Sequence, residues 1–270
     1  MNECFKNYFI LNGTVQPSEL FDSSMVYEGE SVYEVLRMIK GLPVFFEDHA
    51  ARLESSVKLR KKLMLAGKER LKEEIIRLTE TEKMKEVNLK IVFNYNGIKS
   101  NYLIYYIEPV YPTAVQYAKG VKGVLFHAER KDPESKVINH KLRSEIFYKL
   151  ILESAYEALL VNSENCINIF FISNNIIYTA PDKFVLGGIT RKHIIEICIE
   201  NGIKVEFTCV KAEKLNEFES VFMTGTSPVV LSFRTIDGNV FSIRHPYINM
   251  LRSLYLDRAE QSLRYFAKNH

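Results

Sequence analysis

The sequence predicts a protein of two domains that mixes helices and strands, with an α+β first half and an α/β second half. Its 270 residues are enough for two domains of ordinary size. Apolar residues make up 47% and charged residues 26%, and both values are typical of globular proteins. The stretch 108–113 contains two prolines in four positions, which interrupts the pattern and favours a linker. We therefore expect a smaller N-terminal domain over 1–110 and a larger C-terminal domain over 114–270.

Charge and cysteine content exclude several classes of protein. The formal net charge of +3 is too small for a nucleic-acid or membrane surface. Four scattered cysteines form no CxxC pair, which gives no zinc pattern and is typical of a reducing compartment. The first residues are polar, and no apolar run is long enough to span a bilayer. We expect a soluble, cytoplasmic protein with no metal site and no nucleic-acid or membrane partner.

Turn signals and hydrophobic spacing predict the elements of the first half. Asn12-Gly13 and Asn96-Gly97 each end a strand in a turn. The segment 32–39 fits a strand or a helix. Strands are predicted over 8–11, 43–46, 89–95 and 102–107, and amphipathic helices over 47–65 and 68–84.

The second half alternates strands and helices. Asn174-Asn175 predicts a hairpin turn, and Asn201-Gly202 predicts the end of a helix. Strands are predicted over 123–129, 158–161, 167–172, 176–178, 205–209, 220–223, 229–234 and 240–243. Helices are predicted from the lysine turn to about 154, from the 185–191 segment to 200, and over 246–266.

One lysine stands out in the stretch Asp132-Pro-Glu-Ser-Lys136-Val-Ile-Asn139. A proline-containing turn carries Lys136 into an apolar patch, and Asn139 can cap the helix that follows. Loss of hydration disfavours the charged form of an amine. The neutral amine is the form that Schiff-base chemistry requires. The alternative is an ordinary solvated lysine.

Two later loops suit a phosphate group. The segment 187–190 opens a helix with two glycines, so free backbone N–H groups and the helix dipole favour an anion. The segment 224–227 offers hydroxyl groups and close backbone approach. A glycine turn and a hairpin loop are the ordinary alternatives. Together with Lys136, the two loops suggest a phosphorylated cofactor that carries a carbonyl group.

Several motifs together resemble the class IV pyridoxal-phosphate aminotransferases. The opening motif is Gly29-Glu-Ser-Val-Tyr33-Glu34-Val-Leu-Arg37, followed by Gly41, Phe45, His49, Arg52-Leu53 and Ser56. Later segments match in the same order: Asn168-Ile-Phe170, 178–181, 186–191 and 219–226. The resemblance covers nearly the whole chain. The family includes branched-chain and D-amino-acid aminotransferases and aminodeoxychorismate lyase.

The resemblance implies a fold of the D-amino-acid aminotransferase type (fold type IV) with pyridoxal 5'-phosphate between the two domains. It implies an amino acid and a keto acid as substrates, and a homodimer in which the segment around Tyr33 lies near the partner's active site. A lyase reaction and a non-catalytic relative are the alternatives. The substrate and its stereochemistry stay open, because no arginine–histidine pair of the D-amino-acid type occurs around 93–97.

The resemblance also assigns roles to residues. Family members have an asparagine three residues after the Schiff-base lysine and a Glu-Ala-Leu-Leu-type strand further on. Lys136 matches both features through Asn139 and Glu157, whereas Lys141 matches neither. Lys136 is therefore the expected Schiff-base lysine, which acts as general base and acid.

The expected cofactor contacts come from both halves of the chain. Arg52 matches the arginine that binds the phosphate through paired, charge-assisted hydrogen bonds. Ile189 and Thr190 match backbone donors to the phosphate, and Thr226 matches a hydroxyl donor. Tyr33 matches a residue that faces the substrate pocket.

The chain departs from the family pattern in three places. A glutamate normally lies five residues before the asparagine of Asn168-Ile-Phe170 and keeps the pyridine nitrogen protonated. Here Glu164 lies four residues before Asn168, in a shortened segment, and we expect it to take this role. Lys141 replaces a tyrosine of the branched-chain enzymes, and Ser31 replaces a glycine.

Two further residues of the opening motif allow a structural interpretation. His49 is expected to pack within its helix. A buried ion pair between Glu34 and Arg37 is the alternative to contact with substrate.

Overall fold

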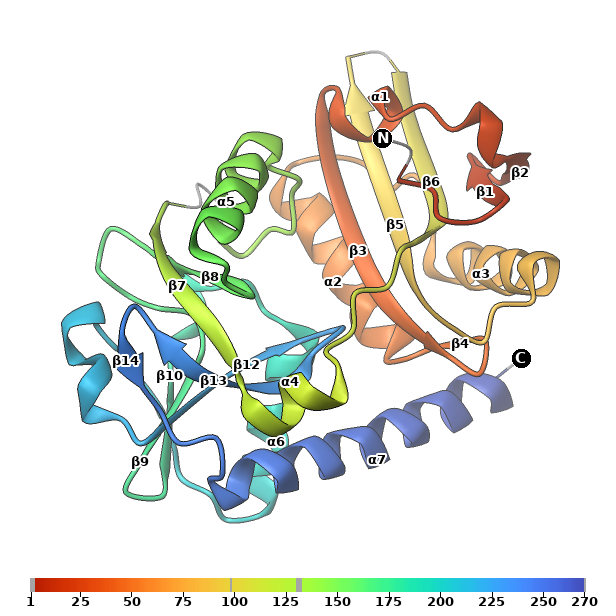
Figure 1. Cartoon of the computed structure of the whole chain (residues 1–270). Coiled ribbons are helices and arrows are strands. Elements are labelled where there is room, and N and C mark those ends of the chain that lie inside the picture. Colours follow the sequence, from red (N-terminus) through yellow and green to blue (C-terminus); the bar gives the residue numbers. More distant parts are fainter. Residues whose placement is uncertain (1–2, 98, 130–132, 270) are drawn as a thin grey trace. The chain divides into compact units, whose positions relative to one another are not determined.

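The structure is a computed structural model that describes residues 3–97, 99–129 and 133–269 (Figure 1). The chain separates into two compact units. Unit 1 comprises Met1–Val110, Ser135–Ile138 and Arg258–His270, and unit 2 comprises Tyr111–Glu134 and Asn139–Asp257. Unit 1 therefore includes two segments from beyond residue 110, one of which carries Lys136. The division into two independent domains at 108–113 stays a prediction.

Unit 1 is built on a six-stranded antiparallel sheet with the strand order β2-β1-β6-β5-β3-β4. Its strands are β1 (Tyr8–Leu11), β2 (Thr14–Pro17), β3 (Glu30–Ile39), β4 (Leu42–Pro43), β5 (Glu86–Asn96) and β6 (Lys99–Ile107). The ambiguous segment 32–39 is thus a strand. The predicted Asn12-Gly13 turn is confirmed, with both residues at positive φ between β1 and β2.

Helices lie on both faces of this sheet. Helices α2 (Phe46–Leu59), α3 (Lys68–Glu82) and the last part of α7 (Pro246–Lys268) cover one face. Helix α1 (Ser24–Tyr27) packs on the other face, where Val26 shares a core with Val92 and Leu103, and a short 3-10 turn η1 (Ser18–Leu20) precedes it. Helix α2 packs on β3, and α3 packs on β1 and β6. Their apolar faces form a core with the sheet through Leu36, Leu53 and Ile75, all fully or almost fully buried.

Two predicted boundaries in unit 1 are wrong. The predicted strand 43–46 stops at Pro43, because Phe45 adopts a left-handed conformation (φ 51°) and α2 begins at the next residue. The helix predicted to reach residue 65 ends at Leu59. Lys61 is left-handed (φ 53°), which ends regular helix geometry two residues later.

Unit 2 is built on a mixed eight-stranded sheet with the order β11-β10-β9-β12-β13-β7-β8, to which β14 is added on β13. The pairs β10–β11, β13–β7 and β7–β8 are parallel. The strands are β7 (Val121–His127), β8 (Glu157–Val161), β9 (Phe170–Ser173), β10 (Ile176–Thr179), β11 (Val205–Phe207), β12 (Ser220–Gly225), β13 (Val229–Ile236) and β14 (Asn239–Val240).

Three helices of unit 2 follow the predicted order, namely α5 (His140–Glu153), α6 (Ile189–Glu200) and the first part of α7. Helix α4 (Ala114–Lys119) has no counterpart in the sequence prediction, and the 3-10 turns are η2 (Asp182–Phe184) and η3 (Ala212–Glu217). The predicted Asn174-Asn175 turn is confirmed at φ 51° and 58°. The strand predicted over 167–172 begins only at Phe170, because Ile167 makes an isolated bridge with Val161 instead.

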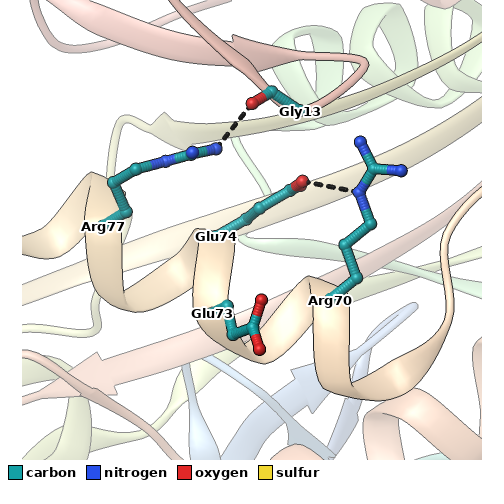
Figure 2. A pocket seen from close by; sticks show the side chains of 5 residues that line it. All are labelled: Gly13, Arg70, Glu73, Glu74 and Arg77. Atoms are coloured by element: carbon teal, nitrogen blue, oxygen red, sulfur yellow. Dashed lines mark hydrogen bonds and ion pairs between the residues drawn. The ribbon is translucent and has the colours of Figure 1, made fainter.

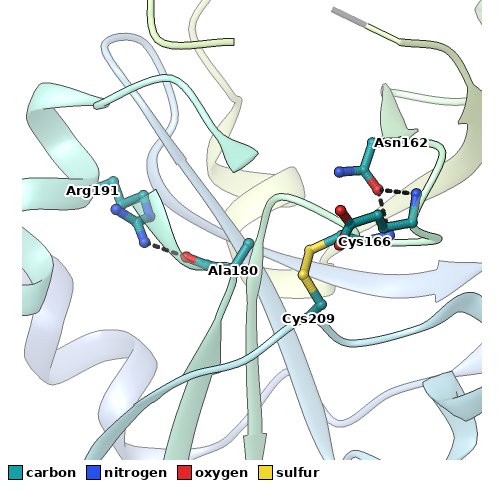
Figure 3. Close-up of a disulfide and its surroundings, with 6 residues drawn as sticks. Asn162, Cys166, Ala180, Arg191 and Cys209 are labelled. Carbon is teal, nitrogen blue, oxygen red and sulfur yellow. Dashed lines mark hydrogen bonds between the residues drawn. A yellow bond between two sulfur atoms is a disulfide. The ribbon is translucent and has the colours of Figure 1, made fainter. Parts of the chain in front are cut away.

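The cysteines of unit 2 correct an inference from the sequence. Cys166 and Cys209 form a disulfide, with their Cα atoms 4.8 Å apart and 43 residues of sequence separation (Figure 3). Cys4 and Cys198 are buried free thiols. The absence of a CxxC pair therefore did not exclude a disulfide, and cysteine spacing no longer argues for a reducing compartment.

Across the described ranges, no helix combines the length and the apolar character needed to cross a membrane. The same ranges contain no group of three or more His, Cys, Asp and Glu side chains placed to bind a metal ion.

Candidate active site

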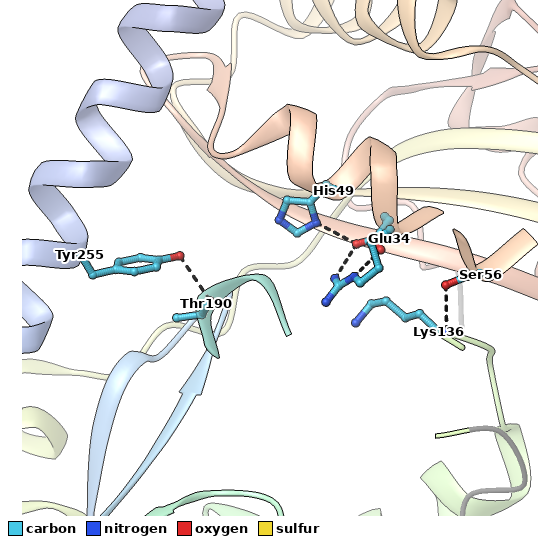
Figure 4. Close-up of polar contacts among 7 residues, drawn as sticks. Glu34, His49, Ser56, Lys136, Thr190 and Tyr255 are labelled. Atoms are coloured by element: carbon cyan, nitrogen blue, oxygen red, sulfur yellow. Dashed lines mark hydrogen bonds and ion pairs between the residues drawn. The ribbon is translucent and has the colours of Figure 1, made fainter. Parts of the chain in front are cut away.

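A buried carboxylate organises the polar centre of unit 1. Glu34 lies in the middle of β3 and is fully buried, at 0% exposure. Arg52 donates from Nε to Glu34 Oε1 and from Nη2 to Oε2, both at 2.7 Å. His49 Nδ1 lies 2.8 Å from Oε2 (Figure 4). His49 and Arg52 are three residues apart on α2, so both project from one helix face toward β3.

The charges in this network follow from burial and contact. Burial alone raises the pKa of Glu34, but the hydrogen bonds from Arg52 and His49 outweigh it and lower that pKa to about 2. Burial lowers the pKa of His49, and the nearby Glu34 only partly offsets this. A neutral His49 that donates from Nδ1 to an ionised Glu34 fits both shifts. The guanidinium of Arg52 is thereby held in one orientation by a two-point contact.

The alternative pair between Glu34 and Arg37 is wrong. Arg37 instead contacts Glu86, with Nη2 2.6 Å from Oε1. Successive side chains of a strand point to opposite faces, so residues 34 and 37 lie on different faces of β3.

Lys136 is fixed by its backbone to the edge of β3. Its N–H donates to Ser56 Oγ at 3.2 Å (Figure 4). Its carbonyl accepts from the N–H of Tyr33 at 3.0 Å. Val137 bridges Val32, and the N–H of Ile138 donates to the carbonyl of Ser31 at 2.9 Å. The segment Ser135–Ile138 thus adds a short strand-like piece to the sheet of unit 1.

The side chain of Lys136 lies on the ring of Tyr33. Its Nζ is 4.9 Å from the ring centroid, within the range of a cation–π contact. Tyr33 and Lys136, the predicted substrate residue and the predicted reactive lysine, are therefore neighbours. Ser56, which anchors Lys136, is a contact that sequence reasoning missed. The spacing of His49, Arg52 and Ser56 on one predicted helix face was the available signal.

Lys141 has a different setting. It is exposed in the first turn of α5, within unit 2. The predicted cap of this helix is confirmed, because Asn139 Oδ1 accepts from the N–H of Leu142 at 3.1 Å.

In unit 2, the predicted phosphate donors lie at the start of a helix and in a turn between two strands. Helix α6 begins at Ile189 with Gly188 as its N-cap, so Ile189 and Thr190 occupy its first turn. N–H groups of a first turn have no acceptor within the helix. Thr190 is buried, and its Oγ1 lies 3.3 Å from the hydroxyl of Tyr255 (Figure 4). Thr226 lies in the turn that joins β12 to β13, and α6 packs on β12.

Glu164 lies in a tight loop between β8 and β9, and its side chain is exposed. Asn162 Oδ1 accepts from the N–H groups of Glu164 (3.0 Å) and Cys166 (2.8 Å) (Figure 3). Cys166 also bridges the Lys211 backbone and bonds to Cys209. The loop backbone is thus fixed at both ends, whereas the Glu164 carboxylate reaches solvent.

One open pocket of unit 1 contains none of the predicted site residues. It is lined by Gly13, Arg70, Glu73, Glu74 and Arg77 (Figure 2). Arg70 Nε lies 2.9 Å from Glu74 Oε1, and Arg77 Nη2 donates to the carbonyl of Gly13 at 2.6 Å. The Arg70 contact lies within α3, and the Arg77 contact joins α3 to the β1–β2 turn, so both have a structural explanation.

The family model of class IV aminotransferases matches residues 31–236. The chain therefore belongs to the class IV aminotransferases, a family of pyridoxal-phosphate-dependent enzymes of fold type IV. The expected family, fold and cofactor are thereby confirmed.

Individual relatives agree with this assignment. The D-alanine aminotransferase of Bacillus licheniformis is 26% identical over 235 residues, which cover 81% of this chain and 83% of the relative. A probable branched-chain-amino-acid aminotransferase of Rickettsia bellii is 28% identical, with 92% and 94% covered.

Solved structures show the same fold. The branched-chain aminotransferase of Thermoproteus uzoniensis has a TM-score of 0.84 at 19% identity, with 96% of each chain covered. A putative 4-amino-4-deoxychorismate lyase of Legionella pneumophila has a TM-score of 0.76 at 21% identity, with 85% of this chain and 91% of the other covered.

The residues present fit the family's cofactor. A guanidinium has five N–H donors, and the contacts of Arg52 with Glu34 use its Nε and Nη2 edge. An amine held on an aromatic ring and a helix that begins at a glycine suit an aldehyde and a phosphate, respectively.

Proposed function

We propose that this aminotransferase uses Lys136 as its reactive lysine and acts on a branched-chain or D-amino acid with a keto acid as acceptor. The observation that supports this most is the double anchoring of Lys136 to Ser56 and Tyr33, which leaves its amine on the Tyr33 ring. A lysine that must form and release a covalent bond needs a fixed backbone and a movable amine. The exposed Lys141 has no such setting.

Each predicted residue has a defined task in this proposal. When bound, pyridoxal phosphate supplies an aldehyde and an electron-withdrawing ring. Arg52 would bind its phosphate in the orientation that Glu34 imposes. The N–H groups of Ile189 and Thr190 and the hydroxyl of Thr226 would donate to the same phosphate. Lys136 Nζ would take the proton from the α-carbon of the substrate, and Tyr33 would line the substrate pocket.

We assign the carboxylate beside the pyridine nitrogen to Glu164. A carboxylate there keeps that nitrogen protonated and stabilises the negative charge that develops when the α-proton leaves. The loop backbone around Glu164 is fixed by Asn162 and by the disulfide, and the exposed carboxylate is the part of this residue that would turn toward the cofactor. Glu164→Gln should retain the cofactor and lose transamination by orders of magnitude. An unchanged rate in this variant would remove the assignment.

The substrate is tested with the cofactor-loaded protein. The relatives named above support two donor classes, so the panel contains L-leucine, L-valine and D-alanine. A productive donor should shift the visible absorbance of the bound cofactor and release a keto acid. A protein that binds the cofactor but responds to no amino donor would support the non-catalytic alternative.

A homodimer is part of the proposal. Helix α5 exposes Phe147, Tyr148, Ile151 and Leu152 at 58–82% of their surface, although large apolar side chains usually avoid such exposure. Light scattering should give twice the mass of the chain, and Leu152→Glu should shift it toward the monomer. A monomeric wild-type protein at micromolar concentration would contradict the dimer. The cytoplasmic location stays a prediction that cell fractionation tests.

A further inference from the structure

A lysine is buried on the sheet face of unit 1 that points away from α2 and α3. Lys90 lies in the middle of β5 and is 1% exposed. Its neighbours on the strand, Leu89 and Ile91, belong to the core under the helices, so alternation places Lys90 on the opposite face. Its Nζ lies 5.9, 5.5 and 5.7 Å from the ring centroids of Tyr27, Tyr33 and Tyr105. A buried ammonium is costly unless an anion and hydrogen bonds compensate it.

The compensating anion is the carboxylate of Glu3. Lys90 Nζ lies 2.7 Å from Glu3 Oε1, and the hydroxyls of Tyr27 and Tyr105 each donate to Oε2 at 2.9 Å. Burial raises the pKa of Glu3, but the charge and hydrogen bonds of Lys90 and the two tyrosines lower it overall. One ammonium and two hydroxyls thus meet both oxygens of one carboxylate.

The three donors lie on helices and strands of unit 1, whereas the carboxylate comes from the segment before the first strand. Tyr27, Lys90 and Tyr105 come from α1, β5 and β6, which are parts of the packed body of unit 1. Glu3 precedes the first strand, and its side chain is 23% exposed against 1% for Lys90. The chain beyond Glu3 is anchored, because Cys4 is buried in a core with Phe9 and the N–H of Phe5 donates to the carbonyl of Tyr106 at 2.8 Å. Rotation of the Glu3 side chain alone would withdraw the carboxylate and leave the three donors in place.

We propose that Tyr27, Lys90 and Tyr105 form a binding site for small carboxylates, which Glu3 fills from within the chain and which an acidic ligand can occupy in its place. The donor set selects the ligand class, because a buried ammonium with two hydroxyl donors matches a singly charged, two-oxygen anion. A tethered occupant competes at an effective concentration on the order of millimolar. Free carboxylates therefore bind weakly to the wild-type chain and more tightly once Glu3 is removed.

The site borders the residue predicted to face the substrate. The ring centroid of Tyr33 lies 5.5 Å from Lys90 Nζ and 4.9 Å from Lys136 Nζ. The ligand is accordingly either the carboxylate of a substrate or a separate small acid. The existence of the site does not depend on the proposed function. The choice between a substrate and a separate small acid rests on that function.

The test is chemical rescue of stability in the full chain, measured with and without pyridoxal phosphate. Glu3→Ala removes the carboxylate that compensates the buried charge of Lys90 and should lower the Tm. Sodium acetate should restore the Tm in a saturable way. The acetate concentration that gives half of this rise should be about tenfold or more lower for the variant than for the wild type. Sodium chloride at equal ionic strength controls for screening. Glu3→Ser, which also shortens the side chain and opens the site, provides a second background if Glu3→Ala folds poorly.

The double variant Glu3→Ala/Lys90→Met is the matched control, and it should show no response to acetate beyond that to chloride. Equal responses of single and double variants would overturn the proposal and leave Glu3–Lys90 as a structural ion pair. In the active holoenzyme, acetate that competes with the keto acid in Glu3→Ala identifies the site as part of the substrate pocket. Rescue of Tm without such competition identifies a separate small acid as the ligand.

Discussion

Glu34 and Glu164 show how differently the two units hold the residues expected to act in catalysis. Glu34 is fully buried and receives contacts from Arg52 and His49, which lower its pKa to about 2. Glu164 is exposed, and only its backbone is held, through Asn162 and the nearby disulfide.

The same contrast extends to the other predicted residues. In unit 1, the predicted residues are held by contacts between side chains, so Glu34 sets the orientation of Arg52 before any ligand binds. In unit 2, the predicted phosphate donors depend on backbone features, namely the first turn of α6 and the β12–β13 turn. Variants of side chains should therefore disturb unit 1 most, whereas variants of loop connections should disturb unit 2 most.

Glu34→Gln should produce the largest loss of stability. It leaves Arg52 without its buried counter-charge, which typically costs about 3–5 kcal/mol. Glu86→Gln is the matched control, because it also removes a carboxylate from a β-sheet arginine pair, but Glu86 is 53% exposed. That change should cost less than about 1 kcal/mol in urea unfolding. Equal costs for the two variants would contradict the buried network.

The same carboxylate predicts the direction of the pH dependence. The folded-state pKa of Glu34 is lowered from 4.5 to about 2, so its contribution is complete above pH 4.5 and is lost as the pH falls toward 2. The lowered pKa of His49 acts in the same direction, since the unfolded state takes up a proton first as the pH falls below 6.5. Urea midpoints of the wild type should decline on acidification, and Glu34→Gln should flatten the decline below pH 4.5. An unchanged slope in the variant would show that Glu34 is not the responsible group.

Local signals explain the parts of the fold that sequence predicted well. Asn12-Gly13, Asn139 and Gly188 each act on a turn or a helix start within a few residues, and each has the expected role. The wrong strand at 43–46 has the converse explanation. Its apolar residues fit a strand, but the left-handed Phe45 turns the chain into α2.

Contacts between distant residues explain what sequence could not predict. Glu34 and Arg37 would share a face on a helix, and the open choice between helix and strand for 32–39 left that pair possible. The strand sends Arg37 to Glu86 and Glu34 to Arg52. Likewise, the bond between Cys166 and Cys209 and the burial of Lys90 depend on partners that no local pattern specifies.

Loss of the disulfide should affect unit 2 by a smaller amount than loss of Glu34 affects unit 1. Cys209→Ser frees a connection across 43 residues, for which chain entropy sets an upper value of about 4 kcal/mol. Strain and residual structure reduce the expected loss of unfolding free energy to about 2–3 kcal/mol, measured without reductant. Reductant should bring the wild type to the level of the variant. A variant as stable as the oxidised wild type would show that the bond contributes nothing.

Gly29→Ala should give the smallest of these losses. Gly29 has φ +76°, and a Cβ there would lie 2.5 Å from the carbonyl oxygen of Tyr95. Gly97 has φ +59° with nothing within 4 Å of its Cβ position, so Gly97→Ala carries only the backbone cost of about 1 kcal/mol. Gly29→Ala should cost about 2 kcal/mol, because the contact adds to the same backbone term. Thermal unfolding of both variants measures the difference, and equal losses would mean that the chain relaxes around the new methyl group.

The most direct test of the central claim is the identity of the lysine that binds the cofactor. The cofactor-loaded protein is reduced with borohydride and digested, and the modified lysine is located by mass spectrometry. The double anchoring of Lys136 to Ser56 and Tyr33 predicts the label on Lys136 and none on Lys141. Lys136→Ala should abolish the label, whereas Lys141→Ala should leave it intact. Label on Lys141, or no label in a protein that binds pyridoxal phosphate, would contradict the assignment of Lys136.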